Sequence, residues 1–165
     1  PSWMEFSYRD SVLRRPDAPK AVVTKVEMKL LEKPAKAIFD EAREYQRQRI
    51  SKQPPPASAG SFFKNVVDAD LAQRVSGLTE GMRKAGVVPS GFLIEAGGLK
   101  GFRLGGALVG KKHANFLLNV NEAKAAEIRS LAHHVRSTVF GQFGVWLEEE
   151  VLYLGDWSEF VPTKA

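Results

Sequence analysis

Three short segments of this sequence carry residue types that can do chemistry. The first is Gly60-Ser61-Phe62-Phe63-Lys64-Asn65. The glycine lets a ligand approach the backbone beside the serine, and the lysine and asparagine supply a charge and a polar amide. The serine lacks the G-x-S-x-G elbow, which argues against a hydrolase nucleophile. The alternative interpretation is a loop that leads into a sheet, with both phenylalanines in the core.

The second segment combines a glycine pair with a basic turn. Gly105-Gly106 lies within residues 101–107, and the turn that follows contains Lys111 and Lys112. The pattern matches neither G-x-G-x-x-G nor a Walker loop. Two interpretations remain open. The turn lysines can face a diphosphate, or the glycines can serve close strand packing beside an ordinary basic turn.

The third segment is the acidic run Glu148-Glu149-Glu150. In a strand, Glu150 would share one face with Trp146, Leu152 and Leu154, so we expect Glu150 to point toward the core. A buried carboxylate there would need a partner. Three consecutive acids are also typical of a solvated stretch, and this alternative stays open.

The sequence predicts no metal site. It contains no cysteine, which also excludes disulfides. The adjacent His133 and His134 lie on a predicted helix, where neighbouring side chains diverge and cannot form an i, i+4 metal pair. We interpret both as surface or helix-packing residues.

Hydrophobic periodicity predicts the elements that must position these segments. Alternation over residues 20–31 predicts a half-buried strand, and Pro34 starts a helix that runs to about Arg49. The Pro-rich segment 53–60 ends that helix. The elements predicted after it are a helix at 70–84, a short helix capped by Ser90, strands at 102–109 and 115–120, a long helix capped by Asn121, and a strand at 145–154. This order predicts an α+β fold, with a mixed β-sheet covered by helices.

Composition and charge narrow the class of protein. The 165 residues include 44% hydrophobic and 26% charged residues, which are ordinary globular values. No apolar run reaches the roughly 20 residues that cross a bilayer, and no signal peptide opens the sequence. Because the first residue is Pro1, we expect a fragment. The absence of cysteine fits a cytoplasmic protein.

The net charge of +5 favours anionic partners. These partners are phosphorylated or carboxylated small molecules, or nucleic acid; the alternative is a modestly basic solvated surface. The basic residues form no block of five or more, which argues against a nucleic-acid-binding tail.

Five separated motifs, taken together in order, resemble one enzyme family. They are FSYRDS (6–11), SAGSFFKN (58–65), LKGFRLGGA (99–107), KHANFLLN (112–119) and FGVWLEEEV (143–151). This series closely resembles the UDP-N-acetylenolpyruvoylglucosamine reductase family. The resemblance covers nearly the whole chain.

The resemblance implies an NADPH-dependent FAD oxidoreductase of peptidoglycan synthesis, and thus of cell-wall biogenesis, cell shape and cell division. Such a flavoprotein reduces UDP-N-acetylglucosamine enolpyruvate to UDP-N-acetylmuramate in the cytoplasm. By analogy, residues 1–31 are the tail of the FAD-binding domain, 32–54 a connecting helix and linker, and 55–165 the substrate-binding domain. The implied partners are the UDP-sugar substrate and the N-terminal FAD-binding region, without nucleic acid or membrane. FAD would be bound mainly by that missing region, so we expect this chain alone to be inactive.

The resemblance also assigns roles to residues. It implies a catalytic arginine at Arg9, a general-acid serine at Ser61 and a catalytic glutamate at Glu150. The proposed substrate-binding residues are Lys52, Asn65, Lys111 and Lys112; the first two match family positions, and the two turn lysines come from their residue types.

The sequence departs from the family at three places. Val66 and Glu149 stand where the family has proline, and residues 9–61 contain no YGDL loop, which resembles the shorter branch of the family. Two alternatives compete with the reductase. One is a non-enzymatic basic α+β domain that binds a nucleotide sugar or nucleic acid. The other is a related flavin oxidase, which would not be expected to carry the SAGSFFKN and KHANF motifs.

Overall fold

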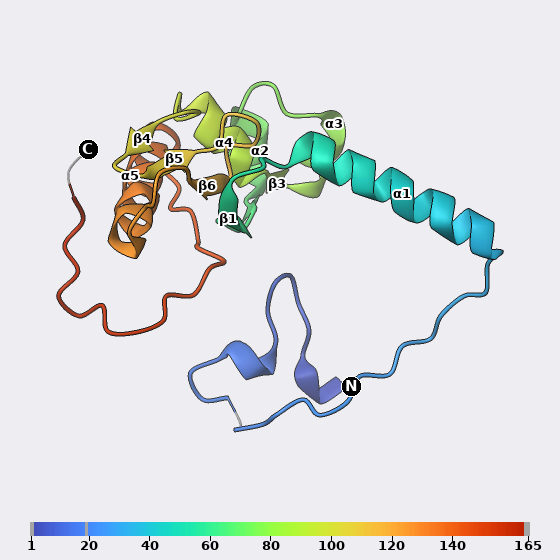
Figure 1. Ribbon diagram of the computed structural model, residues 1–165. Helices are drawn as coiled ribbons and strands as arrows, with labels where there is room; N and C mark the ends of the chain where they lie inside the picture. Colours follow the sequence, from blue (N-terminus) through green and yellow to red (C-terminus); the bar gives the residue numbers. More distant parts are fainter. Residues whose placement is uncertain (1, 19, 164–165) are drawn as a thin grey trace. The chain divides into compact units, whose positions relative to one another are not determined.

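The computed structural model describes residues 2–18 and 20–163. The chain divides into two compact units, Pro1–Arg47 and Gln48–Ala165, and each is described by itself (Figure 1). Among the described residues, every helix is too short or too polar to span a lipid bilayer.

The first unit has little regular structure. It contains the 3-10 helices η1 (Ser2–Met4) and η2 (Val12–Arg14), and most of helix α1 (Ala35–Lys52), which ends in the second unit. Ser11 is the one buried residue among described residues 2–18 and 20–47. This part of the chain therefore has no hydrophobic core of its own.

The strand predicted at residues 20–31 is wrong. These residues form no helix or strand, and Val22, Met28 and Leu30 are exposed. Their alternation gives one apolar face, but a strand also needs a neighbour to pair its backbone groups. No described segment pairs with it.

Helix α1 confirms the prediction that Pro34 starts a helix. The first backbone bond runs from Ile38 N to the Pro34 carbonyl, 3.1 Å, and Lys36 pairs with Asp40 at i, i+4, 2.7 Å. Every side chain of α1 is exposed, so the described residues give its predicted apolar stripe nothing to pack against.

The second unit is built on a four-stranded antiparallel sheet with the order β1-β6-β5-β4. Its strands are β1 (Ala57–Ser61), β4 (Arg103–Leu104), β5 (Ala107–Val109) and β6 (Phe116–Asn119). A separate two-stranded ladder joins β2 (Val66–Val67) and β3 (Val87–Val88). With helices packed on these strands, the α+β class is confirmed, and the strand pairs among the described residues are antiparallel.

Helices pack on these strands and on one another to close the core. They are α2 (Ala69–Arg74), α3 (Glu80–Ala85), α4 (Ser90–Ala96) and α5 (Ala125–Phe143). Helix α5 packs on β4, β5 and β6 (Figure 1). It buries Leu131, Ala132, Val135 and Val139, which keep the helical spacing read from the sequence.

The single helix predicted at 70–84 is two helices. Helix α2 ends at Arg74, and α3 starts after Thr79, whose hydroxyl accepts from Met82 N at 3.3 Å. Gly77 between them has a φ of +86°. That left-handed conformation cannot continue an α-helix, and glycine adopts it without steric cost.

The strand predicted at 102–109 is a hairpin. Strands β4 and β5 pair through Arg103 and Leu108, and Gly105-Gly106 makes the turn. A Cβ at Gly106 would lie 2.3 Å from the Asn121 carbonyl oxygen, so only glycine fits there. The turn is thus packed against the segment that leads into α5.

Two predicted helix caps are also wrong. Lys124, not Asn121, is the N-cap of α5, and the Glu127 carboxylate accepts from Lys124 N at 2.9 Å. Ser90 is the first residue of α4 after the N-cap Pro89. Its hydroxyl instead donates to the Lys64 carbonyl, a long-range contact that the local pattern cannot reveal.

The strand predicted at 145–154 is replaced by an extended segment with one isolated bridge, Phe63 to Glu149. The side chains of this segment do alternate between the core and solvent, but the odd-numbered residues are the ones that face the core. Leu147 is fully buried, and Val145, Val151 and Tyr153 pack against the core. Trp146, Leu152 and Leu154 are 51%, 77% and 88% exposed, so the expected inward face of this segment is wrong.

Candidate functional site

The segment that contains Ser61 lies between two other parts of the second unit. On one side, Phe62 N donates to the Asn115 carbonyl, 2.8 Å. On the other side, Glu150 N donates to the Phe62 carbonyl and Lys64 N to the Glu148 carbonyl, each 2.8 Å. The structure therefore pairs the serine segment with the acidic segment, although they are far apart in sequence.

A bulge presents Ser61 at the end of β1. The pairing with β6 shifts register between Ser58 and Ser61, and Gly60 within the shift has a φ of +84°. A Cβ at Gly60 would meet nothing within 4 Å, so the glycine is required by its backbone conformation. Ser61 itself is exposed.

The three glutamates have different surroundings. The Glu149 side chain is 21% exposed and lies 3.9 Å from Nη1 of Arg136, whose Nε donates to the Leu147 carbonyl at 2.9 Å. Burial, followed by the neighbouring Glu149 carboxylate, raises the pKa of Tyr153. Glu149 thus belongs to the face that packs on α5. Glu150 is half-buried on the alternate face, and its backbone N–H holds Phe62.

The polar residues after Ser61 are tied to α4. The Asn65 side-chain oxygen accepts from Ser90 N at 3.3 Å, and the Ser90 hydroxyl donates to the Lys64 carbonyl. The Lys64 ammonium pairs with Glu148 across the two segments. Asn65 is exposed, so its amide NH₂ is the donor it can offer a ligand.

The three predicted substrate lysines are exposed, and one of them, Lys112, contacts the end of α1. Lys112 Nζ donates to the Ile50 carbonyl at 2.8 Å, in the last turn of α1, which ends at Lys52. The stem of Lys111 lies over Gly101, where a Cβ would approach Lys111 Cε to 3.0 Å. We call Lys52, Lys111 and Lys112 the lysine cluster. All three residues are exposed and belong to the second unit.

Arg9 lies in the first unit. Its φ is +56°, an uncommon conformation for arginine, and its guanidinium carbon is 5.9 Å from the centre of the Tyr8 ring.

Comparisons with known proteins settle the family. A family model described as UDP-N-acetylenolpyruvoylglucosamine reductase, C-terminal domain, matches residues 49–154, more than half of the chain. The chain belongs to this reductase family. It is 37% identical over 183 residues to the UDP-N-acetylenolpyruvoylglucosamine reductase of Pasteurella multocida (strain Pm70), covering 94% of this chain and 53% of that protein.

Other relatives agree. The reductase of Caldicellulosiruptor bescii is 33% identical, over 96% of this chain and 45% of that protein. The crystal structure of the Thermus caldophilus reductase superposes with a TM-score of 0.62 at 32% identity, covering 91% of this chain and 45% of that chain. The chain spans about half the length of the curated relatives it matches.

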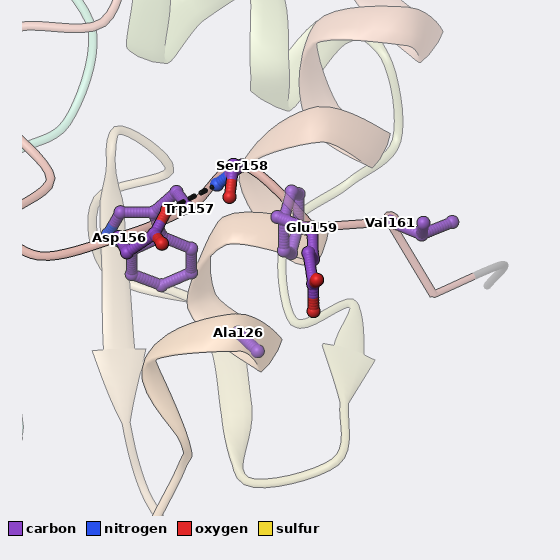
Figure 2. A pocket seen from close by; sticks show the side chains of 7 residues that line it. Ala126, Asp156, Trp157, Ser158, Glu159 and Val161 are labelled. Carbon is purple, nitrogen blue, oxygen red and sulfur yellow. Dashed lines mark hydrogen bonds between the residues drawn. The ribbon is translucent and has the colours of Figure 1, made fainter.

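Two hollows in this reductase domain lie away from the predicted site residues. One of about 420 Å³ is lined by Ala126 of α5 and by residues 156–161 (Figure 2). Within it, Ser158 N donates to the Asp156 carboxylate at 2.9 Å. The other, of about 250 Å³, lies between α2, α4 and the end of α5. Neither is lined by Ser61, Glu150 or the lysine cluster.

Residues 153–160, beside the first hollow, pack on α5 through an arginine. The Arg129 guanidinium lies 4.3–4.7 Å from the ring centres of Tyr153, Trp157 and Phe160. This contact holds the C-terminal segment of the reductase domain in place.

Two of the histidines, His113 and His134, are partly buried. His134 stacks on Phe102 at 4.4 Å between ring centres, which confirms it as a helix-packing residue, and burial lowers its pKa. Burial, followed by Lys100, lowers the pKa of His113. The described residues contain no group of three or more acidic or histidine side chains able to hold a metal ion.

Sequence reasoning missed three residues that hold the paired segments together. Ser90 and Arg136 bind backbone carbonyls of the two segments, and Asn115 binds Phe63 with its side-chain amide. Asn115 lies in the KHANFLLN motif, but the motif gives no sign of its partner.

Proposed function

We propose that this chain is the substrate-binding portion of an enzyme that reduces UDP-N-acetylglucosamine enolpyruvate to UDP-N-acetylmuramate, for peptidoglycan precursor synthesis in the cytoplasm. Membership of the family supports this function. The observation that carries it is the pairing of two segments distant in sequence, one with Ser61 and the other with Glu150, through the Phe62 carbonyl.

NADPH and FAD are part of this proposal. They rest on the family, because the matched family model describes its C-terminal domain and the chain spans about half the length of its relatives. We therefore assign FAD mainly to a part of the protein that this chain does not contain. The domain boundaries 1–31, 32–54 and 55–165 belong to the same proposal.

The residue types fit the chemistry of the substrate. Reduced flavin, when bound, would supply a hydride to the β-carbon of the enolpyruvyl group, which would leave negative charge on the α-carbon and its carboxylate. We assign stabilisation of this charge to the Arg9 guanidinium and the Glu150 carboxyl group. The Ser61 hydroxyl then donates its proton to the α-carbon and regains one from solvent. A carbanion is basic enough to take a proton from an ordinary serine, so placement decides the rate.

The lysine cluster and Asn65 suit the nucleotide half of the substrate. A diphosphate requires cations and N–H donors together. Lys112 donates to the Ile50 carbonyl in the last turn of α1, and Lys52 is the last residue of that helix. Asn65 can offer its NH₂ group beside the serine segment, because its side-chain oxygen is the atom that bonds Ser90 N. We therefore assign Lys52, Lys111, Lys112 and Asn65 to substrate binding.

Ligand binding tests this proposal against the basic-domain alternative. In the full-length protein, Lys111→Ala should raise the KM for the enolpyruvyl sugar about 5- to 10-fold, as expected for one exposed phosphate contact of about 1 kcal/mol. Lys84→Ala is the matched control, because Lys84 is an exposed lysine on α3 paired with Glu80. Its KM should stay at the wild-type value.

The alternative makes the opposite prediction. A nucleic-acid-binding domain would bind random DNA more tightly than UDP-N-acetylglucosamine, with an affinity that falls steeply with salt. Titration calorimetry of both ligands separates the two hypotheses. Tighter, salt-sensitive DNA binding would contradict the reductase proposal.

A further inference from the structure

We propose that Asn115 is a positioning residue that fixes the Ser61 segment against the Glu150 segment. Its side chain is buried, with 4% of the residue exposed. The amide oxygen accepts from Phe63 N at 2.9 Å, and the amide nitrogen donates to the Phe63 carbonyl at 2.8 Å. One side chain thus satisfies both backbone groups of one residue 52 positions away.

The side chain is needed because the neighbouring strand ends. Strand β6 begins at Phe116, and the chain before it turns, with Phe116 N donating to the His113 carbonyl at 3.1 Å. The backbone of Asn115 still pairs with Phe62, but no backbone is left to pair with Phe63 on this side. A primary amide has the donor and acceptor of a peptide group, so Asn115 extends the sheet by one residue.

Phe63 has no other way to satisfy these groups. On the side of the acidic segment, Phe63 lies opposite Glu149. The hydrogen bonds there are made by the neighbouring residues: Lys64 N donates to the Glu148 carbonyl, and Glu150 N donates to the Phe62 carbonyl. In such a pair, the N–H and C=O of the central residues point away from each other. Those of Phe63, which is 1% exposed, therefore point at Asn115. Without the amide, a buried donor and a buried acceptor would be left unpaired.

This contact lies next to the proposed chemistry. Phe63 is two residues from Ser61, and the Phe62 carbonyl that accepts from Glu150 N is bonded directly to the Phe63 nitrogen. A displacement of Phe63 therefore changes where Ser61 lies relative to Glu150. The functional part of this inference rests on the proposed function, whereas the structural part does not.

The substitution Asn115→Asp tests the donor and the acceptor separately in the full-length protein. An ionised Asp at 115 accepts from Phe63 N but cannot donate to the Phe63 carbonyl, whereas a protonated one does both. At pH 8 the Tm of the domain should fall by about 5 °C or more. Because burial beside a carbonyl raises the pKa of this Asp above its unfolded value, the deficit should shrink as the pH is lowered toward 5.

Asn119→Asp is the matched control. Asn119 is the last residue of β6, four positions after Asn115. It is exposed and uses its side-chain oxygen to accept from Ala123 N at 2.8 Å, which a carboxylate does equally well. Its Tm should follow the wild type at both pH values. If Asn115→Asp does not accumulate, Asn115→Ser, whose hydroxyl is too short to replace the amide and carries no charge, is used in both assays, with a Tm deficit that is the same at both pH values.

The two half-reactions supply the functional result. Oxidation of the reduced protein by the enolpyruvyl sugar should slow about 10- to 100-fold in Asn115→Asp, as expected for a misplaced catalytic group. Reduction by NADPH should match the wild type, and Asn119→Asp should match it in both. Equal slowing of both half-reactions, or none, overturns the positioning role, and an unchanged Tm at pH 8 overturns the hydrogen-bonded clamp. An inactive wild type would instead refute the proposed function and leave the Tm comparison decisive for the clamp.

Discussion

Leucine 147 anchors the acidic segment to the core, and its truncation should loosen that segment. The side chain is fully buried, and Arg136 on α5 holds its carbonyl at 2.9 Å. Leu147→Ala removes three carbons from a packed site and leaves a cavity, so we expect a loss of about 3 kcal/mol within the usual range of about 2–5 kcal/mol. For a 165-residue chain, this corresponds to a fall in Tm of about 6–12 °C.

The matched control is Leu152→Ala, the same substitution five residues later in the same segment. Leu152 is 77% exposed, so its truncation should change the unfolding free energy by less than about 0.5 kcal/mol. Urea unfolding of both variants, followed by circular dichroism, measures the difference. A larger loss for Leu152→Ala would refute the register described for this segment and would restore the inward face that the sequence alone predicts.

Three further predictions follow from packing, charge and domain assignment. Gly106→Ala should cost about 2–3 kcal/mol because its Cβ would lie 2.3 Å from the Asn121 carbonyl oxygen, whereas Gly141→Ala, with open space on the exposed face of α5, should be neutral or stabilising in the same unfolding assay. Because the folded-state pKa of Tyr153 is raised, its contribution to stability is complete below about pH 10 and is lost as the pH rises above that value. The unfolding free energy should therefore fall above pH 10 in the wild type and less so in Tyr153→Phe; equal pH profiles would exclude this origin. Finally, this chain alone should purify without the absorbance of flavin and should not oxidise NADPH, and a yellow preparation with stoichiometric FAD would contradict the assignment of FAD to another part of the protein.

The two long helices could be predicted from the sequence because their signals are local and sustained. Pro34 starts α1, and the apolar spacing from Leu131 to Val139 identifies the buried face of α5. Alternation was a poorer guide at 20–31 and 145–154. It describes the side chains of a strand, but a strand also needs a partner for its backbone, and alternation does not say which of the two faces is covered.

The site was predictable only as a set of motifs. The SAGSFFKN and LEEEV motifs identify the segments of Ser61 and Glu150, and the structure pairs them through Phe62 and Phe63. The role of Asn115 could not be predicted, because it depends on a turn just before β6 that lies beside a residue 52 positions earlier. Such a contact is created by the tertiary fold and leaves no local pattern in the sequence.

Ser61→Ala in the full-length protein tests the central claim most directly, because the proposed serine acts only when the substrate needs a proton. Stopped-flow absorbance separates the reduction of the protein by NADPH from its oxidation by the enolpyruvyl sugar. Reduction should stay at the wild-type rate, and oxidation should slow by at least about 10²–10⁴-fold, as expected for a lost general acid. Glu150→Gln should slow oxidation as well, and Glu149→Gln should change it little. If Ser61→Ala slows both half-reactions equally, or neither, the serine is not the proton donor and the proposed mechanism is wrong.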